Sequence, residues 1–187
     1  MFVVDTNILV YAANIDCVEH DRCSQLVGGW RSSPAPWCVT HGILYEFLSV
    51  ITHRGELASP WSVAKAWGFV ESLLDSPGLQ VLTETPRHVE IARMTFEEVS
   101  GPSGRHLHDA HVAILMREHG ISRIVTRDTG FHRFPFIEVV DPLTGSWELH
   151  ESRPGGPHHS SRSRHGEPAV RRKRAAARVP APRPRHR

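Results

Sequence analysis

The feature that most constrains the fold is the alternation of short apolar runs with longer amphipathic stretches. The short runs lie at residues 2–4, 37–39, 79–82, 121–126 and 136–140. Between them, apolar residues recur at helical spacing, as in Cys23, Leu26, Val27 and Trp30. Strands that alternate with helices normally pair in parallel, with helices packed on the faces of the sheet. The pattern therefore predicts an α/β fold of three layers, α/β/α, around a five-stranded parallel sheet.

Turn and capping residues set the expected helix boundaries. Thr40 is a plausible N-cap for the helix after the second strand. Ser59-Pro60 and Thr85-Pro86 each place a capping residue before a proline, which suits the first position of a helix. Gly120 is a good C-cap residue. Helices are expected after Asp5, at about 19–31, after Thr40, and at 60–75, 86–99 and 106–119.

Charge is distributed unevenly along the chain. Residues 1–150 carry 11 Lys and Arg against 18 Asp and Glu, whereas residues 151–187 carry 11 against 2. The second segment is rich in Arg, Pro, Ser and Ala and has almost no core-forming residues, so we expect it to be disordered. We place the boundary between a folded domain and this basic tail at 147/148. The tail is either an RNA-binding arm or an extension without a function.

The remaining compositional signals favour a cytoplasmic protein. The three cysteines, Cys17, Cys23 and Cys38, show no CxxC spacing, and we expect them to be reduced. The apolar run at the N-terminus is interrupted by Asp5 and has no preceding basic residues, which is unlike a signal peptide. No apolar stretch approaches the ~18 residues that a membrane span requires.

Four acidic residues occupy positions where carboxylates are uncommon. Asp5 closes the first strand and Asp128 lies just past the fourth. Asp109 is near the start of the helix that leads into the fourth strand, and Glu46 is in the first half of the helix after the second. In an open parallel sheet these positions share one edge, where ligands bind beyond the carboxyl ends of the strands. We therefore expect the four carboxylates to converge.

Such a cluster needs a cation. Two carboxylates about 5 Å apart repel by roughly 3 kcal/mol at an effective dielectric constant near 20. Oxygen ligands suit Mg²⁺ or Mn²⁺, and these ions support phosphoryl chemistry. Each acid also has a local explanation, because Asp5 could cap a helix, Asp128 could belong to a turn, Asp109 could favour a helix N-terminus and Glu46 could be solvated. Four such coincidences on one edge are a poorer explanation than a metal site.

The phrases that carry these acids resemble those of PIN-domain ribonucleases, and among them the VapC toxins of type II toxin–antitoxin pairs. The matching segments are VVDTNILVYA (3–12), THGILYEF (40–47), HDAHVAILMREHG (108–120) and IVTRDTGFHRF (124–134), and the resemblance covers about residues 1–147. It implies that Asp5, Glu46, Asp109 and Asp128 are the metal-binding and catalytic quartet, supported by Thr6, Asn7 and Thr126. The basic tail departs from the family pattern.

The resemblance further implies a Mg²⁺- or Mn²⁺-dependent endoribonuclease that forms a homodimer and is inhibited by a small VapB-like antitoxin. Arg105, Arg127 and Arg133 are candidate RNA contacts, although they could equally pair with the acids or face solvent. We expect water to attack the phosphorus, leaving a 5′-phosphate and a 3′-hydroxyl, because no Ser, Cys or Tyr stands beside an evident base.

Other functions remain open from the sequence. A PIN-fold module without catalysis would keep the fold and bind RNA or regulate a partner. HLHDAH (106–111) nearly matches the HxHxDH phrase of zinc hydrolases, but its Asp is one place early and it leads into a helix. The same histidines could form a metal-independent pair that leaves a cyclic phosphate. A dehalogenase-type phosphatase needs DxD, where this chain has Asp5-Thr6-Asn7.

Overall fold

The computed structural model describes residues 1–55, 57, 59–99, 104 and 106–144. Arg105 and the predicted basic tail, 148–187, lie outside the described residues. None of the described helices is long and apolar enough to cross a membrane.

A single sheet of parallel strands organises the described residues. Its strands are β1 (Val3–Val4), β2 (Trp37–Thr40), β3 (Leu79–Leu82), β4 (Arg123–Val125) and β5 (Glu138–Val140), in the order β3-β2-β1-β4-β5. Val3 pairs with Cys38 on one side and with Ile124 on the other. The chain therefore leaves β1 toward β2 and β3, and later returns to the opposite side of β1 as β4. The α/β fold with a five-stranded parallel sheet is confirmed.

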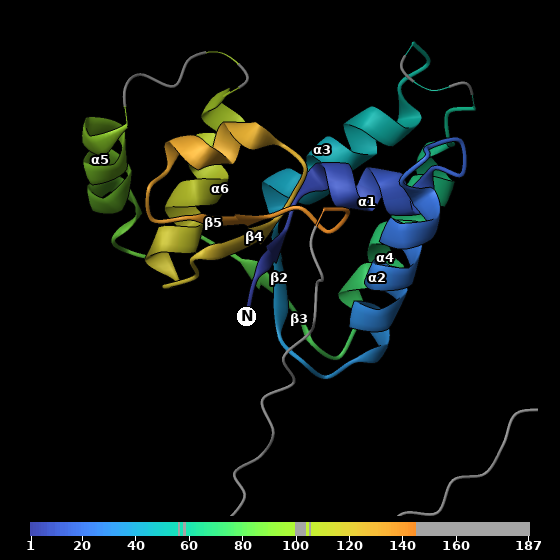
Figure 1. The fold of residues 1–187 in the computed structure, drawn as a ribbon, viewed down its shortest axis with the longest axis horizontal. Helices are drawn as coiled ribbons and strands as arrows, with labels where there is room; N and C mark the ends of the chain where they lie inside the picture. Colours follow the sequence, from blue (N-terminus) through green and yellow to red (C-terminus); the bar gives the residue numbers. More distant parts are fainter. Residues whose placement is uncertain (56, 58, 100–103, 105, 145–187) are drawn as a thin grey trace, which may run out of the picture. The chain divides into compact units, whose positions relative to one another are not determined.

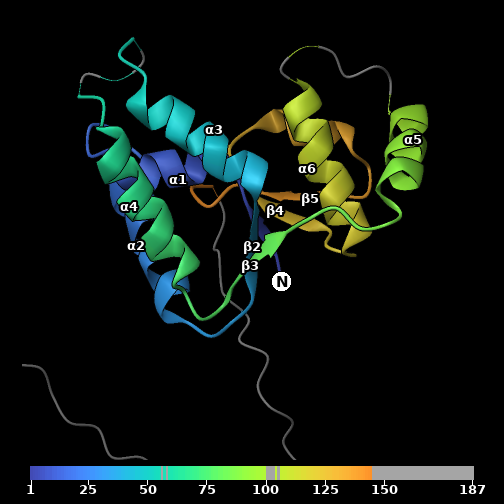
Figure 2. The same cartoon turned by 180° about the vertical axis from the view of Figure 1, so that it is seen from behind.

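The helices form two groups. The connections between strands contain α1 (Thr6–Ala13), α2 (His20–Ser32), α3 (His41–Thr52), α4 (Val63–Leu74), α5 (His88–Glu98) and α6 (His106–Glu118). Figures 1 and 2 both show α1–α4 together on one side and α5 with α6 on the other, with β1 and β2 between the groups. A short 3₁₀ helix, η1 (Thr129–Arg133), follows β4.

The core is apolar and aromatic. Its largest fully buried side chains include Trp30, Trp37, Phe47, Phe131 and Phe134. Trp30 of α2 packs edge-to-face on Phe2, with ring centroids 5.2 Å apart, which ties a helix to the first strand.

Two predicted helix starts are wrong, and one short helix was not predicted. Helix α4 begins at Val63, and Ser62 rather than Ser59 caps it by accepting a hydrogen bond from the Lys65 amide. Helix α5 begins at His88, because the Thr85 hydroxyl accepts from the Arg87 amide and closes a turn before the helix. The helix η1 was not anticipated, since the five residues from Thr129 are too few for a recognisable apolar repeat.

Candidate metal-binding site

All four predicted acidic residues line one pocket of about 300 Å³. We call it the acidic pocket. Its lining comprises Asp5, Thr6, Asn7, Val10, Tyr11, Glu46, Val50, Asp109 and Asp128, so that no Lys or Arg is among the described residues that form its wall. The four carboxylates therefore converge on one pocket, as the sequence led us to expect.

The sheet topology explains why the residues that follow β1 meet those that follow β4. Val4 pairs with Val125, and the Asp5 amide continues this ladder by donating to the Val125 carbonyl oxygen at 3.1 Å. Residues 5–7 and 126–128 therefore leave adjacent strands at the same edge. The chain reverses its direction across the sheet between β1 and β4, and such a reversal is where ligands bind in open parallel sheets.

Asp5 is the most enclosed of the four acids, with 7% of its surface exposed. Its Oδ1 accepts from the Thr6 amide at 2.7 Å. Its Oδ2 accepts from the Asn7 side-chain amide at 2.7 Å and from the Thr126 hydroxyl at 2.5 Å. Thr6 and Asn7 follow β1 and Thr126 follows β4, so donors from the ends of two strands hold the Asp5 carboxylate in one orientation.

Burial raises the pKa of Asp5 to about 6, and it does so against the opposing effect of the hydrogen bonds from Thr126 and Thr6. The negative charges of Glu46 and Asp109 raise the pKa further. An ionised carboxylate in this position is costly unless a cation compensates it. The electrostatics of Asp5 therefore match a site that is completed by a positive ligand.

Glu46 reaches the pocket from α3. Thr40 caps this helix, because its hydroxyl oxygen accepts from the Ile43 amide at 3.1 Å. The exposed Glu46 side chain accepts a 2.6 Å hydrogen bond from the Thr6 hydroxyl through Oε2. Thr6 thus links the carboxylate on α3 to the residue that follows Asp5.

Asp109 and Asp128 meet on either side of a glycine. Asp109 lies in the first turn of α6, and burial raises the pKa of its half-buried carboxyl while a bond from His106 at 3.4 Å opposes this rise. Asp128 accepts from the Gly130 amide at 2.7 Å and caps η1. A methyl group on Gly130 would lie 2.9 Å from Asp128 Oδ1 and 3.3 Å from Asp109 Oδ2. The absence of a side chain at Gly130 therefore lets both carboxylates approach.

The supporting residues join these acids into one network. Asn7 donates to both Asp5 and the Thr126 hydroxyl oxygen, at 2.7 and 2.8 Å, and accepts from the Arg127 amide. The Thr126 oxygen also accepts from the Asp128 amide at 2.9 Å. Thr6, Asn7 and Thr126 are all within this network.

The candidate RNA contacts differ in their surroundings. Arg127 pairs with Glu19 at 2.5 Å and with Asp141 at 3.5 Å. Arg133 donates from Nε to the Gly130 carbonyl oxygen at 2.8 Å, and its charge lowers the pKa of Asp109. Arg133 is therefore close enough to Asp109 for its charge to favour the ionised carboxylate, whereas Arg127 is engaged by two acids beside it.

The histidines of the HLHDAH phrase do not gather at one point. His106 contacts Asp109, His108 is exposed, and the His111 Nε2 atom lies 3.7 Å from Glu84 instead. None of them is among the residues that line the acidic pocket. The structure gives no support to a zinc hydrolase centre built on that phrase.

The sequence reasoning missed Tyr11, which lines the pocket, and Gly130, which lies beside two of its acids. Tyr11 lines the wall one helical turn after Ile8 and Asn7, and helical spacing from Asn7 could have identified it. Gly130 could have been found from the phrase Asp-Thr-Gly, since a glycine two residues after an acid commonly reflects a turn around that carboxylate.

The donor set fits a hard divalent cation. Carboxylate oxygens from four separate elements face a pocket whose described wall holds no cationic side chain, and the most buried of them has a raised pKa. Mg²⁺ and Mn²⁺ prefer such oxygen ligands, whereas Zn²⁺ favours nitrogen and sulfur.

Fold and pocket together define a PIN domain, and the family model described as "PIN domain" matches residues 2–137. The chain belongs to the PIN-domain family, as a homologue of the VapC ribonuclease toxins. Ribonuclease VapC43 of Mycobacterium tuberculosis is 31% identical over 149 residues, which cover 80% of this chain and 100% of that protein. Ribonuclease VapC24 of the same species is 32% identical over 156 residues, which cover 77% of this chain and 98% of that protein.

Solved structures share the fold at lower identity. Mycobacterium tuberculosis VapC20, described as a sarcin-ricin loop cleaving toxin, superposes with a TM-score of 0.52 and 17% identity, covering 71% of this chain and 93% of its own. FitAcB from Neisseria gonorrhoeae gives a TM-score of 0.52 and 16% identity, covering 77% of this chain and 99% of its own. These two likenesses support the architecture alone.

Proposed function

We propose that this protein is a Mg²⁺- or Mn²⁺-dependent endoribonuclease and the toxic component of a type II toxin–antitoxin pair. The observation that carries the proposal is the convergence of four carboxylates on a pocket whose described wall contains no Lys or Arg. Its homology to VapC ribonucleases points to RNA as the substrate.

In this proposal Asp5, Glu46, Asp109 and Asp128 hold the cation. When bound, the ion lowers the pKa of water and stabilises negative charge on the scissile phosphate. Thr126 and Asn7 hold Asp5 in place, and Thr6 orients Glu46. These hydrogen bonds fix the carboxylates before the substrate arrives, so little reorganisation is needed at the moment of reaction.

RNA would meet the pocket beside Arg133. The positive charge of Arg133 already acts on Asp109, and its guanidinium has further N–H groups that could bind a phosphate. Arg127 would have to exchange Glu19 or Asp141 for phosphate before it could contribute. Arg105 is retained as a third candidate from the sequence alone.

We propose a small VapB-like antitoxin and a second copy of the chain as protein partners. Structurally similar proteins include VapBC2 from Rickettsia felis and FitAB, each bound to a DNA fragment. Apolar side chains are exposed on α3 and α4, where Tyr45 is 66% and Trp67 43% exposed, around a pocket that includes Leu44 and Leu48. Exposed aromatic residues of this kind are enriched at protein interfaces.

The decisive experiment pairs Asp109→Asn with Glu97→Gln, an exposed acid on α5 away from the pocket. Cleavage of an RNA substrate should require Mg²⁺ or Mn²⁺ and fall by more than about 100-fold in Asp109→Asn, because loss of a ligand should exceed the roughly 10–100-fold cost of disturbing the residues around one. Glu97→Gln should match the wild type. Undiminished cleavage by Asp109→Asn would refute the assigned site, and a wild type that binds no Mn²⁺ in calorimetry would favour a PIN module without catalysis.

A second experiment tests the route of attack. RNA with a 2′-deoxy substitution at the scissile nucleotide should still be cut, leaving a 5′-phosphate and a 3′-hydroxyl that mass spectrometry identifies. Cyclic phosphate products that persist in EDTA would instead assign the reaction to the histidines.

A further inference from the structure

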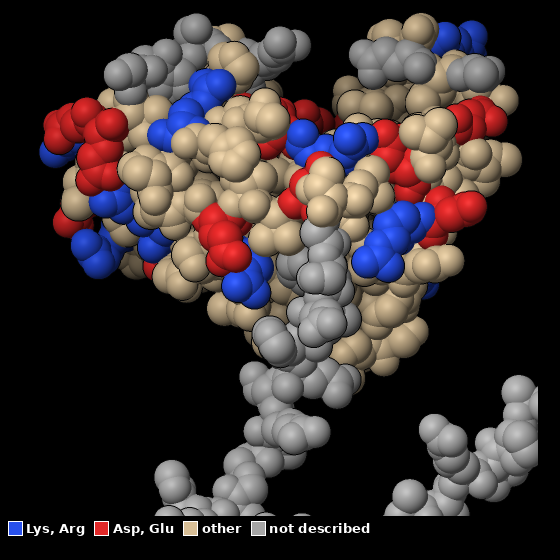
Figure 3. Space-filling view, in the orientation of Figure 1, with Lys and Arg blue, Asp and Glu red and all other residues tan. Residues whose placement is uncertain are grey.

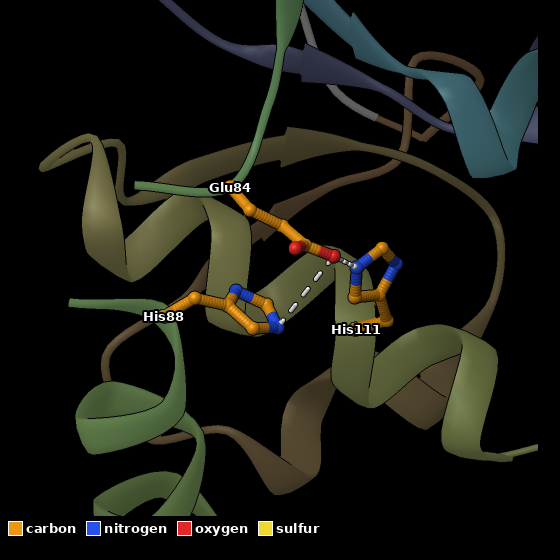
Figure 4. A group of neighbouring side chains, drawn as sticks. All are labelled: Glu84, His88 and His111. Atoms are coloured by element: carbon orange, nitrogen blue, oxygen red, sulfur yellow. Dashed lines mark ion pairs between the residues drawn. The ribbon is translucent and has the colours of Figure 1, made fainter. Parts of the chain in front are cut away.

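A second cluster of metal-ligating side chains lies away from the acidic pocket. Glu84 belongs to the segment between β3 and α5, His88 is the first residue of α5, and His111 lies on α6. One potential ligand atom from each residue lies within 4.8 Å of the other two. Figure 4 shows the three side chains pointing toward one another.

The distances are close to those that a small cation imposes. Glu84 Oε1 is 3.9 Å from His88 Nε2 and 3.7 Å from His111 Nε2. Tetrahedral coordination with bonds of about 2.0–2.1 Å places ligand atoms roughly 3.3 Å apart. Small rotations of the side chains, without movement of the helices, would close the remaining difference.

The ring of His88 is held by a buried neighbour. Its Nδ1 atom is hydrogen-bonded to Glu118, whose side chain is fully enclosed and also accepts from the Thr85 amide at 2.7 Å. Glu118 therefore holds the His88 ring by its Nδ1 side.

This hydrogen bond leaves Nε2 of His88 facing Glu84 Oε1, 3.9 Å away. A carboxylate that orients a histidine through the other ring nitrogen is the usual companion of a metal-bound imidazole. His111 presents its Nε2 to the same Glu84 oxygen, and the two rings meet edge-to-face at 5.6 Å. A carboxylate oxygen and two imidazole nitrogens thus converge on one point, where each can offer a lone pair to a cation.

We propose that Glu84, His88 and His111 form a binding site for a transition-metal cation of the Zn²⁺ class. Two imidazoles and one carboxylate suit Zn²⁺, Co²⁺ or Ni²⁺ rather than Mg²⁺. A neighbouring pocket of about 350 Å³, lined by Glu84 and His111 together with His41, has room for water as a further ligand. The bound ion would join the segment before α5, and α5 itself, to α6.

This site is separate from the acidic pocket. Asp109 and His111 are two positions apart on α6, which turns their side chains by about 200° around the helix axis. None of the three proposed ligands lines the acidic pocket. Zinc binding here would therefore act on the packing of α5 against α6, and it does not depend on the proposed nuclease activity.

The test uses the full chain without an affinity tag, in excess Mg²⁺ to occupy the acidic pocket. Zn²⁺ affinity is measured by competition with a chromophoric chelator, and Co²⁺ is added in parallel for its visible spectrum. The variants are His111→Gln and Glu84→Gln, with His108→Gln as the matched control because His108 is an exposed residue of the same helix. The histidines at 158, 159, 165 and 186 are the same in every variant, so their contribution cancels.

The wild type and His108→Gln should bind one equivalent tightly and show the intense bands of tetrahedral Co²⁺. His111→Gln and Glu84→Gln should lose that equivalent or bind it at least about 100-fold more weakly, and Glu118→Gln should weaken it about 10–100-fold. Zn²⁺ should raise the melting temperature of the wild type and not that of His111→Gln, since a ligand stabilises only the state that binds it. Equal Zn²⁺ affinity and equal thermal shifts in His111→Gln and the wild type would overturn the proposal.

Discussion

Three of the four carboxylates of the acidic pocket also have a local structural place at the start of a helix. Asp5 accepts from the Thr6 amide at the start of α1, Asp128 caps η1, and Asp109 lies in the first turn of α6. Local explanations from the sequence were therefore correct in part, yet they do not account for the convergence. A cap needs only one carboxylate at one helix, and here four from different elements share a pocket.

Asp5 should make the stability of the metal-free protein depend on pH. Its folded-state pKa, about 6, lies above the ordinary value of 3.8. Protonation therefore favours the folded state, and this contribution is complete below pH about 4 and is lost as the pH rises through about 6. The loss amounts to about 3 kcal/mol. Urea denaturation in EDTA across this range should show the decline.

The control for this prediction is Asp5→Ala, which should lack the Asp5 part of the slope. Mn²⁺ should restore stability to the wild type above pH 6, because the cation binds the ionised carboxylate. Identical slopes in the two metal-free proteins would show that Asp5 is not the titrating group.

Gly130→Ala should weaken metal binding. The added methyl group would press on Asp128 Oδ1 and Asp109 Oδ2, at 2.9 and 3.3 Å, and would force them apart. We expect Mn²⁺ affinity to fall about tenfold, and the free energy of unfolding in EDTA to fall by about 0.5–1.5 kcal/mol from displaced side chains. Calorimetry and denaturation measure the two effects.

Gly68→Ala is the matched control. Gly68 is exposed within α4, and an added methyl group there has no heavy atom within 4 Å. This variant should be more stable by about 0.5–1 kcal/mol, with unchanged Mn²⁺ affinity. A Gly130→Ala protein that behaves in the same way would contradict the close approach of the two acids.

At the scale of elements, sequence reasoning succeeded where the signal was local and failed where a boundary depended on competing caps. Thr40 was identified correctly because an apolar helical stripe follows it at once. Ser59-Pro60 was misleading because Ser62 supplies the cap three residues later. The cluster of Glu84, His88 and His111 was not foreseen, since only the packing of α5 against α6 brings residues from positions 84 and 111 together.

Removal of the N-caps of α3 and α4 should separate an effect on stability alone from an effect on stability and RNA cleavage together. Thr40→Ala and Ser62→Ala each remove a side-chain acceptor at a helix N-terminus, and each should cost about 0.5–2 kcal/mol in unfolding free energy. Of these two helices, α3 alone contributes to the acidic pocket, through Glu46 and Val50, so only Thr40→Ala should also reduce RNA cleavage. Equal cleavage by the two variants under native conditions would show that the cap of α3 does not position Glu46.

For the whole molecule, charge divides the chain into two parts with opposite tendencies toward RNA. In the view of Figure 3, acidic and basic side chains are interspersed over the described residues without a broad basic face. Residues 151–187 carry 11 of the 22 Lys and Arg residues. The proposed tail would therefore contribute much of the electrostatic attraction to phosphate.

Deletion of residues 151–187 should leave the thermal stability and the cleavage rate at saturating RNA unchanged. The deletion lowers the formal net charge from +2 to −7, so RNA affinity at low salt should fall. The plot of log affinity against log salt concentration should become flatter by about 0.7 for each phosphate contact that is lost. A deletion protein with the same affinity and the same slope would show that the tail makes no contact with RNA.

The pairing of β1 with β4 also determines when the acidic pocket can exist during synthesis. Residues 5–7 leave the ribosome first, but the residues that hold and face them, 126–130, follow some 120 positions later. A nascent chain, or a product truncated before β4, therefore contains Asp5 and Glu46 without the wall that completes the pocket. The order of strands in the sheet thus delays assembly of the centre until β4 and the residues after it have been made.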